Sequence, residues 1–344
     1  MSAIVYSFSF PHHGEYSSFH HLCDYLGDQI VVDSTFTPPD WLPAQIQGRL
    51  IRYWRQYGEY RLWGYYYQPK SNIFHYLRPE NTMRCGWKWK RNNKLIMSCH
   101  QPIQKLAEMK SAGKQYEGFF NGLAHADVVV VLSKTHIEGY KYYAPNADVL
   151  YIPLGVDTEF FAPSSVTSTR SPMVLTVGSW LRDYACWADV VRNVLSKENA
   201  ADFVVVANDD TIKKARAYLA ADHAKVRFLS GITDEQLRNL YQQASLLFLP
   251  LQDAVANNAL LEAMATGVPS IVTKLPATKE YLGDQAGVLV TDHSPDSYSS
   301  CITKLLDDPI LWQEKSQLSL ARAREYFSWQ HIADEYRSLY RSLS

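Results

Sequence analysis

The chain has 344 residues, a length that favours two domains over one. Hydrophobic residues make up 47% of it and charged residues 20%, which is the balance of a globular protein and excludes disordered and fibrous classes. Lys and Arg total 34 against 35 Asp and Glu. This near balance of basic and acidic residues gives no reason to expect a nucleic-acid partner.

The cysteines are odd in number and show no CxxC pair, which argues against a disulfide framework or a structural zinc site. They are Cys23, Cys85, Cys99, Cys186 and Cys301. No run of about 18 apolar residues occurs, and no basic stretch precedes the first apolar segment. We therefore expect a soluble protein in the cytoplasm.

Apolar runs in the first half predict short strands that alternate with helices. Strands are expected at 3–10, 29–32, 94–98, 127–132 and 149–152, and helices at 20–26 and 102–124. This alternation is typical of a parallel sheet covered by helices, so residues 1–163 are predicted to form a Rossmann-like domain.

A Ser- and Thr-rich stretch at 164–171 predicts a linker, and a second alternating series follows it. Its strands are expected at 173–177, 203–207, 226–229, 246–249, 270–273 and 288–290. Thr233 to Gln236 has the pattern of a helix capping box. Residues 172–327 are therefore predicted to form a second Rossmann-like domain.

The last residues, 328–344, predict an amphipathic helix, because apolar side chains from Trp329 to Leu343 fall on one stripe. Neither first strand is followed by GxGxxG, which argues against a dinucleotide oxidoreductase. In paired folds of this kind, ligands usually bind beyond the carboxyl ends of the strands.

The segment 250–269, PLQDAVANNALLEAMATGVP, is the most informative. Asn257 or Asn258 is a good helix N-cap, and the helix start that follows suits a diphosphate. Glu262 lies one turn further along, where its carboxylate can bind a ribose diol and where we expect it outside the core. The alternative is a solvated glutamate on an ordinary capped helix.

Three blocks resemble the retaining glycosyltransferases of the GT-B fold, particularly glycosyltransferase family 4. They are YIPLGVDTEFFAP, RFLSGITDEQLRNLYQQASLLFLP and LEAMATGVPSIVT. The resemblance implies an α/β fold in which two Rossmann-like domains face each other across a cleft. It also implies that the C-terminal domain binds a nucleotide-sugar donor and that the 328–344 helix crosses back to complete the N-terminal domain.

The resemblance also assigns donor-binding roles residue by residue. It makes Glu262 the carboxylate that holds the ribose hydroxyls. It places the sugar and diphosphate on Asn257, Asn258, Ala259 and Leu260, and the nucleobase edge on Ser230, Gly231 and Ile232. The family usually has a glutamate eight positions before Glu262, and this chain has Ala254 there.

The loop GSWLRDY at 178–184 occupies the place where the family sets an arginine and a lysine on the donor phosphates. Arg182 can bind a phosphate in bidentate fashion and neutralise the leaving group. The lysine has no evident counterpart, and Tyr184, which stands near its place, offers a neutral hydrogen bond. The alternative for Arg182 is an exposed side chain paired with Asp183.

In the first half, His100 ends a strand where the family often has a histidine facing the transferred sugar, although a lone histidine is usually structural. Gly14 would allow close approach of the donor. The strand-end loops also hold His12, His13, Glu80 and Asn81, which are candidate acceptor-binding residues.

Residues 49–94 carry eleven Lys or Arg and two acidic residues, with eleven Tyr or Trp interleaved from Tyr53 to Trp89. This composition suits an anionic membrane surface or an anionic saccharide acceptor. The alternative is a solvated helix whose aromatic residues belong to the core.

Together these features predict a metal-independent, retaining glycosyltransferase that needs no cofactor. It would move a sugar from a nucleotide-diphosphate sugar to a carbohydrate or lipid-linked acceptor, in the cytoplasm or on the cytoplasmic face of a membrane. Two alternatives remain at this point. One is a nucleotide-sugar 2-epimerase of the same fold, and the other is a degenerate, non-catalytic binding subunit.

Overall fold

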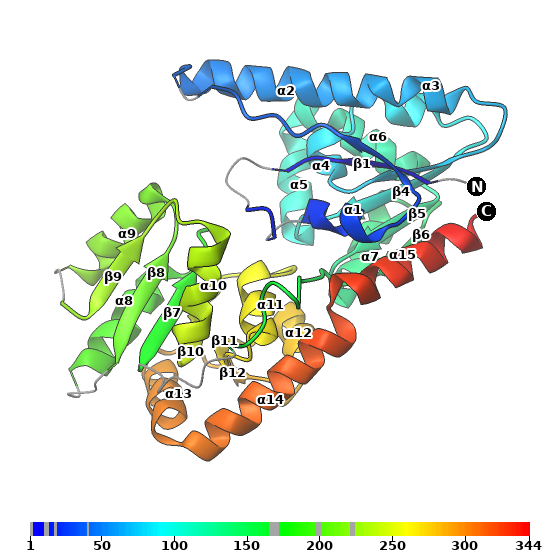
Figure 1. Ribbon diagram of the computed structural model, residues 1–344. Helices are drawn as coiled ribbons and strands as arrows, with labels where there is room; N and C mark the ends of the chain where they lie inside the picture. Colours follow the sequence, from blue (N-terminus) through cyan, green and yellow to red (C-terminus); the bar gives the residue numbers. More distant parts are fainter. Residues whose placement is uncertain are drawn as a thin grey trace. The chain divides into compact units, whose positions relative to one another are not determined.

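The computed structural model describes residues 3–9, 14–16, 19–39, 41–164, 172–196, 201–220 and 224–344. The predicted sites His12 and His13, and residues 165–171 of the expected linker, lie outside this part of the chain. The chain divides into two compact units (Figure 1). Unit 1 comprises Met1–Gly155 with Trp329–Ser344, and unit 2 comprises Val156–Ser328.

Unit 1 contains a six-stranded parallel sheet with the strand order β2-β1-β3-β4-β5-β6. Its strands are β1 (Ala3–Ser7), β2 (Ile30–Asp33), β3 (Ile73–Tyr76), β4 (Lys94–Cys99), β5 (Val128–Val131) and β6 (Asp148–Tyr151). β1 pairs with both β2 and β3, so that Ile4 lies beside Ile30 on one side and Phe74 on the other. All six carboxyl ends therefore lie at one edge.

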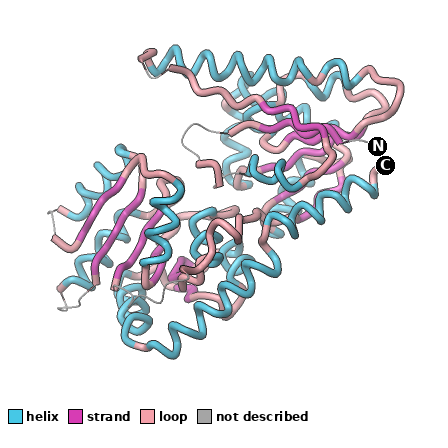
Figure 2. The backbone as a smooth tube through the Cα atoms, in the orientation of Figure 1, coloured by secondary structure: helices cyan, strands magenta, loops and turns pink. Residues whose placement is uncertain are grey.

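Helices connect these strands, as Figure 2 shows. The α-helices are α1 (Leu22–Tyr25), α2 (Ala44–Arg61), α3 (Trp63–Tyr66), α4 (Pro79–Thr82), α5 (Ile103–Ser111), α6 (Glu117–His125), α7 (Ile137–Tyr143) and α15 (Trp329–Ser342). The 3-10 helices are η1 (Phe19–His21), η2 (Gly86–Trp89), η3 (Gly113–Tyr116) and η4 (Lys134–His136). The predicted helix at 102–124 is divided into α5 and α6, because Gly113 adopts a φ of 80° between them.

The sequence analysis missed β3, whose residues IFHY include a histidine that weakens the apolar pattern. His75 is fully buried, and its ring nitrogens lie 2.7 Å from the hydroxyls of Tyr340 and Ser98. Burial lowers the pKa of His75 to about 3, so the ring is neutral. Both nitrogens are satisfied, and a polar residue therefore fits a central strand.

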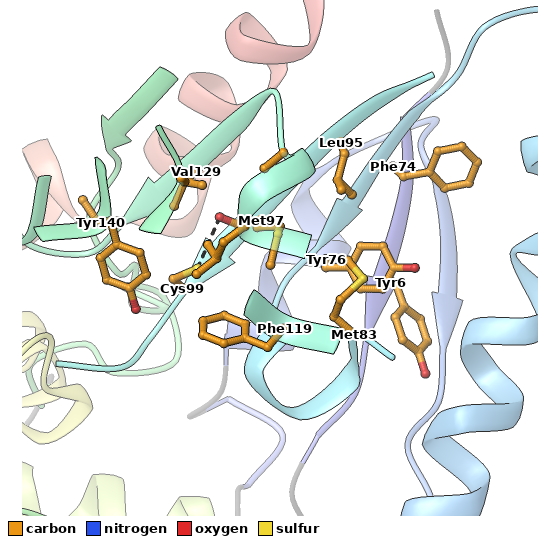
Figure 3. Close-up of a cluster of buried hydrophobic side chains, with 14 of the residues drawn as sticks. Tyr6, Phe74, Tyr76, Met83, Leu95, Met97, Cys99, Phe119, Val129 and Tyr140 are labelled. Carbon is orange, nitrogen blue, oxygen red and sulfur yellow. Dashed lines mark hydrogen bonds between the residues drawn. The ribbon is translucent and has the colours of Figure 1, made fainter. Parts of the chain in front are cut away.

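The core of unit 1 combines large aromatic and sulfur-containing side chains, as Figure 3 shows. Tyr6 and Tyr76 meet edge to face with their ring centroids 5.4 Å apart. Tyr66 stacks on Phe74 at 3.6 Å and covers the sheet from α3. These contacts bury the apolar faces of tyrosines while their hydroxyls find polar partners.

α2 is held against this core by a close approach at Gly58. A Cβ there would stand 2.5 Å from the Tyr6 hydroxyl and 2.6 Å from the Ser34 Cβ. The next residue, Glu59, is fully buried, and its carboxylate accepts backbone N–H groups from Arg84, Cys85 and Gly86. These charge-assisted hydrogen bonds offset part of the cost of burying the charge, although burial still raises the pKa of Glu59.

Unit 2 repeats the plan with a parallel sheet in the order β12-β11-β10-β7-β8-β9. Its strands are β7 (Met173–Val177), β8 (Asp202–Val206), β9 (Val226–Leu229), β10 (Leu246–Leu249), β11 (Ser270–Thr273) and β12 (Val288–Val290). Its helices are α8 (Tyr184–Leu195), α9 (Asp209–Leu219), α10 (Asp234–Gln243), α11 (Asn258–Ala265), α12 (Pro276–Leu282), α13 (Pro295–Asp307) and α14 (Pro309–Tyr326).

The capping box and the strands that the sequence predicts in unit 2 are confirmed. The capping box at Thr233 is present, because its hydroxyl accepts the N–H of Gln236 and its own N–H donates to the Gln236 side chain. Five of the six predicted strands have the expected bounds, and β8 is displaced by one residue. Continuous apolar runs bounded by turn residues explain this agreement.

The structure draws the unit boundary before the expected linker at 164–171. Residues 156–163 lie with unit 2, where Val156 donates its N–H to Phe327 and Gln242 donates to the Ala162 carbonyl. At the other end, α15 belongs to unit 1 and buries Trp329, Ile332, Ala333, Tyr336 and Tyr340. The predicted apolar stripe is therefore the buried face of this helix.

The approach at Gly58 predicts a stability difference between two glycines of α2. Gly58→Ala should lower the free energy of unfolding by about 1–3 kcal/mol, because the new methyl group overlaps Tyr6 and Ser34. Gly48→Ala, on the same helix with nothing within 4 Å of the new Cβ, should raise it by about 0.5–1 kcal/mol. Urea unfolding of both variants tests this, and equal effects would contradict the close packing.

Candidate functional site

In unit 2, the loops after β7 and β10 are joined by backbone hydrogen bonds. Asp183 donates its N–H to Pro250 at 2.9 Å, and Gln252 donates to Leu181 at 3.0 Å. Arg182 and Leu251 form an isolated antiparallel bridge between these bonds. Leu181 has a φ of 59°, a strained value for a branched side chain. The pairing therefore fixes the backbone on both sides of Arg182.

The Arg182 guanidinium is directed inward and held by three acceptors. It donates to the carbonyls of Val177 at 3.1 Å and Trp180 at 2.8 Å, and to Asn257 Oδ1 at 3.1 Å. Gly178 has a φ of 100°, and a Cβ there would stand 2.7 Å from this guanidinium. Burial lowers the pKa of Arg182, while attraction to Glu262 opposes that shift.

The alternative interpretation of Arg182, an exposed pair with Asp183, is wrong. Asp183 instead caps α8 through the N–H of Cys186, and its other oxygen lies 3.2 Å from His293. Tyr184 also differs from expectation, because its buried hydroxyl donates to the Gly178 carbonyl at 2.7 Å. That hydroxyl stabilises the loop.

Asn257 is the N-cap of α11, and its side-chain oxygen accepts the N–H of Leu260 at 3.3 Å. The same oxygen accepts a hydrogen bond from Arg182. A guanidinium and a helix N-terminus therefore meet at one point, and both favour an anion. Asn258, which follows the cap, is half-buried, whereas the side chains of Ala259 and Leu260 are buried.

Glu262 is buried at 3% exposure, so the expectation that it lies outside the core is wrong. Its Oε2 accepts a hydrogen bond from the Tyr241 hydroxyl at 2.9 Å. Burial and the neighbouring carboxylate raise the pKa of Tyr241 well above its ordinary value, so Tyr241 stays a donor. The alternative of a solvated glutamate is also wrong.

Ser230 and Gly231 are exposed at the end of β9, and Ile232 is half-buried. Gly231 has a φ of 63°, and a Cβ placed there would have nothing within 4 Å of it. The turn therefore requires glycine for its backbone conformation and not for space. β9 is the edge strand, two places from β7, so the structure sets these residues at the carboxyl edge that carries Arg182.

The position where the family usually has a glutamate is occupied by buried Ala254. The adjacent Asp253 turns back on the chain, because its Oδ1 accepts the N–H of Ala254 at 2.8 Å. Asp253 therefore does not take the place of the missing carboxylate in this conformation.

In unit 1, the predicted residues His100 and Glu80 follow the adjacent strands β4 and β3. His100 Nε2 donates to the Leu77 carbonyl at 2.7 Å, and its ring meets Phe19 edge to face at 4.5 Å. Glu80 is buried at 6% exposure, and burial raises its pKa to about 7. Its Oε1 lies 3.5 Å from the side-chain nitrogen of Gln101.

Two further candidates of unit 1 also follow strands of its sheet. Asn81 is half-buried within α4 and donates its backbone N–H to the Arg78 carbonyl at 3.0 Å. Gly14 is half-buried in the connection that follows β1. Both therefore lie after carboxyl ends of adjacent strands, β3 and β1.

Within the described residues, no group of three or more His, Cys, Asp or Glu side chains is arranged to hold a metal ion. Asp209 and Asp210 form the first turn of α9, whose N-cap is Asn208. All five cysteines are free thiols. In the same described part of the chain, no helix is both long and apolar enough to cross a membrane.

Residues 171–308 match the family described as Glycosyl transferases group 1. A D-inositol 3-phosphate glycosyltransferase of Corynebacterium jeikeium is 31% identical over 250 residues, which are 64% of this chain and 58% of the relative. An MMP alpha-(1->4)-mannosyltransferase of Mycolicibacterium hassiacum is 24% identical over 267 residues, which are 72% of this chain and 64% of the relative. The chain thus covers less than two thirds of either relative.

Among solved structures, Anabaena HepE in complex with UDP and glucose has a TM-score of 0.72 at 13% identity, over 99% of this chain and 100% of that one. The fold is therefore GT-B, and the predicted α/β class is confirmed. The chain resembles the glycosyltransferases of family 4, as its motifs indicated, and residues 171–308 are similar to the glycosyl transferases group 1 family.

The sequence analysis missed two residues that shape the site. Tyr241 falls on the apolar stripe of α10 and reads as a core residue, yet its hydroxyl binds Glu262. Gly178 follows a strand, where its sequence position predicts an ordinary turn residue, yet Arg182 packs against it. The place of a residue on an apolar helix stripe or in a turn does not show which polar group it contacts. That contact depends on tertiary packing.

Because Glu262 is buried, its removal should cost stability. Glu262→Ala should lower the free energy of unfolding by about 1–3 kcal/mol, since the Tyr241 hydroxyl loses the nearer of its two acceptors, keeping the Ala259 carbonyl at 3.3 Å, and a cavity remains. Glu262→Gln keeps the shape and an acceptor oxygen, so it should cost clearly less. Urea unfolding measures both, and an unchanged Glu262→Ala variant would show that the side chain is not packed as described.

Proposed function

We propose that the protein is a glycosyltransferase that uses a nucleotide-diphosphate sugar and retains the anomeric configuration. The observation that carries this proposal is the contact between the Arg182 guanidinium and the N-cap of α11. It offers a fixed positive charge and backbone N–H groups at one point, as a departing diphosphate requires.

The proposed donor lies along the carboxyl edge of the unit 2 sheet. Arg182 and the first residues of α11 bind the diphosphate, and Glu262 accepts hydrogen bonds from the ribose. Tyr241 orients that carboxylate through its 2.9 Å hydrogen bond. The nucleobase edge meets the backbone at Ser230 and Gly231. The complex of HepE with UDP and glucose supports a nucleotide diphosphate as the donor's leaving group.

As the bond between the sugar and the diphosphate breaks, negative charge grows on the leaving oxygen. Arg182 is already oriented by three hydrogen bonds, so it stabilises that charge without reorganising. The acceptor is a carbohydrate or a lipid-linked saccharide, and His100 is proposed to hydrogen-bond the sugar near the reacting carbon. The Leu77 carbonyl fixes its Nε2 as the donor nitrogen, which leaves Nδ1 as the acceptor in the neutral ring.

We also propose that unit 1 attaches to an anionic membrane surface through α2 and its neighbours. On α2, Ile46, Leu50, Tyr53, Tyr57 and Tyr60 are exposed at intervals of four and three residues, which form one stripe. Trp63 and Tyr67 continue this exposed aromatic surface. Figure 1 shows α2 leading directly into α3.

The charges around this stripe favour an anionic bilayer over a neutral one. The exposed cations of the 49–94 segment are Arg49, Arg52, Arg61, Lys70, Lys88 and Arg91. Both acidic residues of the segment, Glu59 and Glu80, are buried. Exposed Tyr and Trp with cations and without exposed carboxylates are typical of an interfacial helix.

The activity is tested by incubating the protein with a panel of nucleotide-diphosphate sugars and measuring the slow release of free sugar. We expect hydrolysis of one donor, and Arg182→Ala should lower kcat by about 10² or more because the leaving group loses its charge partner. The donor KM should rise less. Lys214→Ala, which removes an exposed cation from α9 of the same unit, should leave both constants unchanged.

Other outcomes of this panel would contradict the proposal. Formation of a sugar epimer would favour the 2-epimerase, and absence of binding to every donor would favour a non-catalytic subunit. Unchanged turnover in Arg182→Ala would show that the phosphates are bound elsewhere.

The membrane proposal is tested by flotation with phosphatidylglycerol and phosphatidylcholine vesicles. Binding should rise with phosphatidylglycerol content and fall with salt, since the Debye length falls from about 10 Å at 0.1 M to about 3 Å at 1 M. Arg49→Glu with Lys88→Glu should weaken binding at low salt, by about 1 kcal/mol per cation removed. Tyr53→Ser with Tyr57→Ser should weaken it at every salt concentration.

The matched control is Lys213→Glu with Lys214→Glu, which changes two exposed cations of unit 2. It should bind vesicles like the unmodified chain. If the unmodified chain ignores anionic vesicles at low salt, the membrane proposal fails, and a protein partner for α2 becomes the better explanation.

A further inference from the structure

A hydrogen-bonded network lies beside the paired loops after β7 and β10 of unit 2. At its centre is His293, in the connection between β12 and α13. Its Nε2 lies 3.2 Å from Asp183 Oδ2, and its Nδ1 lies 3.0 Å from the Tyr298 hydroxyl and 3.3 Å from Thr273 Oγ1. Thr273 Oγ1 in turn accepts the N–H of Leu251 at 2.7 Å. We call these five residues the His293 network.

The network reaches both of the paired loops. Asp183 belongs to the loop after β7, and Leu251 belongs to the loop after β10, where it forms the bridge with Arg182. His293 contacts Asp183 directly and reaches Leu251 through the hydroxyl of Thr273. A single imidazole therefore links the two loops whose pairing orients Arg182.

The hydrogen bonds of the network fit one tautomer of the neutral imidazole. The Asp183 carboxylate only accepts, so Nε2 of His293 carries the proton and Nδ1 is an acceptor. Burial raises the pKa of Tyr298, so its hydroxyl stays protonated and can donate to Nδ1. Thr273 then donates to the Tyr298 oxygen at 2.6 Å while it accepts from Leu251. Each donor of the network thus meets an acceptor.

The backbone is strained on both sides of this contact. His293 has a φ of 53° and Leu181, in the loop after β7, has a φ of 59°. In the described part of the chain, these are two of the four residues other than glycine with a positive φ. Strain of this kind persists only where the surrounding structure enforces it, and it gathers at functional sites.

His293 itself is not part of the apolar core. Its side chain is 35% exposed, and that of Asp183 is 22% exposed. Removal of the imidazole therefore leaves a space that is open to solvent, and a His293 variant should fold. The role of the side chain in the site can then be tested apart from stability.

We propose that His293 is a positioning residue for binding of the donor diphosphate. It holds Asp183, and with it the loop after β7, so that the Arg182 guanidinium stays directed at the N-cap of α11. His293 acts through Arg182 and contacts neither the donor nor the reacting atoms. This inference rests on the proposed glycosyl transfer and adds to it the residue that keeps Arg182 preorganised.

Three variants test the link with the donor that the panel identifies. His293→Ala should lower kcat about tenfold and raise the donor KM less, because a displaced Arg182 stabilises the leaving group less well. His293→Gln should restore most of this loss, since its amide nitrogen can take the place of Nε2. His293→Asn tolerates the left-handed backbone but is too short to reach Asp183, and it should not. Equal rates in the Gln and Asn variants would overturn the proposal.

A double variant shows whether His293 acts through Arg182. In an Arg182→Ala background, His293→Ala should lower kcat no further, because effects that pass through one group are not additive. A second tenfold loss would overturn the proposal. The matched control is Asn193→Ala, which removes a 3.0 Å hydrogen bond to Asp296 between the same helices, α8 and α13, at the other end of α8. Its kcat should be unchanged, and a loss equal to that of His293→Ala would also overturn the proposal.

A last experiment needs no donor. Proton–nitrogen NMR spectra of the full chain, at about pH 8 and above the ordinary titration range of histidine, should show the Nε2–H tautomer for the imidazole that disappears in His293→Gln. The Arg182 Nε–H donates to Val177, and its signal is the one lost in Arg182→Ala. This signal should shift in His293→Ala and return in His293→Gln. The Nδ1–H tautomer, or an unmoved Arg182 signal, would overturn the proposal.

These spectra separate this inference from the proposed transfer. If no donor is hydrolysed, the transfer fails, and the Arg182 signal still shows whether His293 positions that side chain. If one donor is hydrolysed and the Arg182 signal does not respond, the role of His293 fails alone. Urea unfolding checks that each variant is folded under the assay conditions.

Discussion

The pairing of the loops after β7 and β10 is the constraint on which the candidate donor site depends. Two backbone hydrogen bonds join Asp183 to Pro250 and Gln252 to Leu181. They hold Leu181 in a left-handed conformation and direct Arg182 toward the N-cap of α11. A charge fixed in this way needs no rearrangement when an anion develops, and preorganisation of this kind is what makes such groups effective.

Much of the fold follows from sequence patterns. The strands of unit 2 are continuous apolar runs bounded by turn residues, and five of them have the bounds that the pattern predicts. β3 does not follow, because His75 is accommodated by hydroxyls of Ser98 and Tyr340 that are distant in the sequence. The unit boundary also escapes prediction, since long-range bonds at Val156 and Ala162 outweigh local composition.

The candidate site was predictable in its positions and less so in its contacts. Asn257 caps α11 because an Asn before a helical run is a local signal. The burial of Glu262 is not local, because it depends on the Tyr241 hydroxyl arriving from another helix. Arg182 likewise finds its partners in carbonyls and a cap rather than in the neighbouring Asp183. Spacing locates a polar residue, and tertiary packing decides its partner.

Because the chain departs from the family pattern, Arg182 has a larger part in the proposed binding of the diphosphate. Ala254 offers no carboxylate, Asp253 is turned to its own backbone, and the Tyr184 hydroxyl is used by Gly178. In the proposed transfer, stabilisation of the leaving diphosphate is therefore assigned to Arg182 and the α11 N-terminus, where one asparagine oxygen links the two. The proposed site thus keeps a positive charge for the diphosphate, and it has no carboxylate at position 254 that could bind the donor sugar.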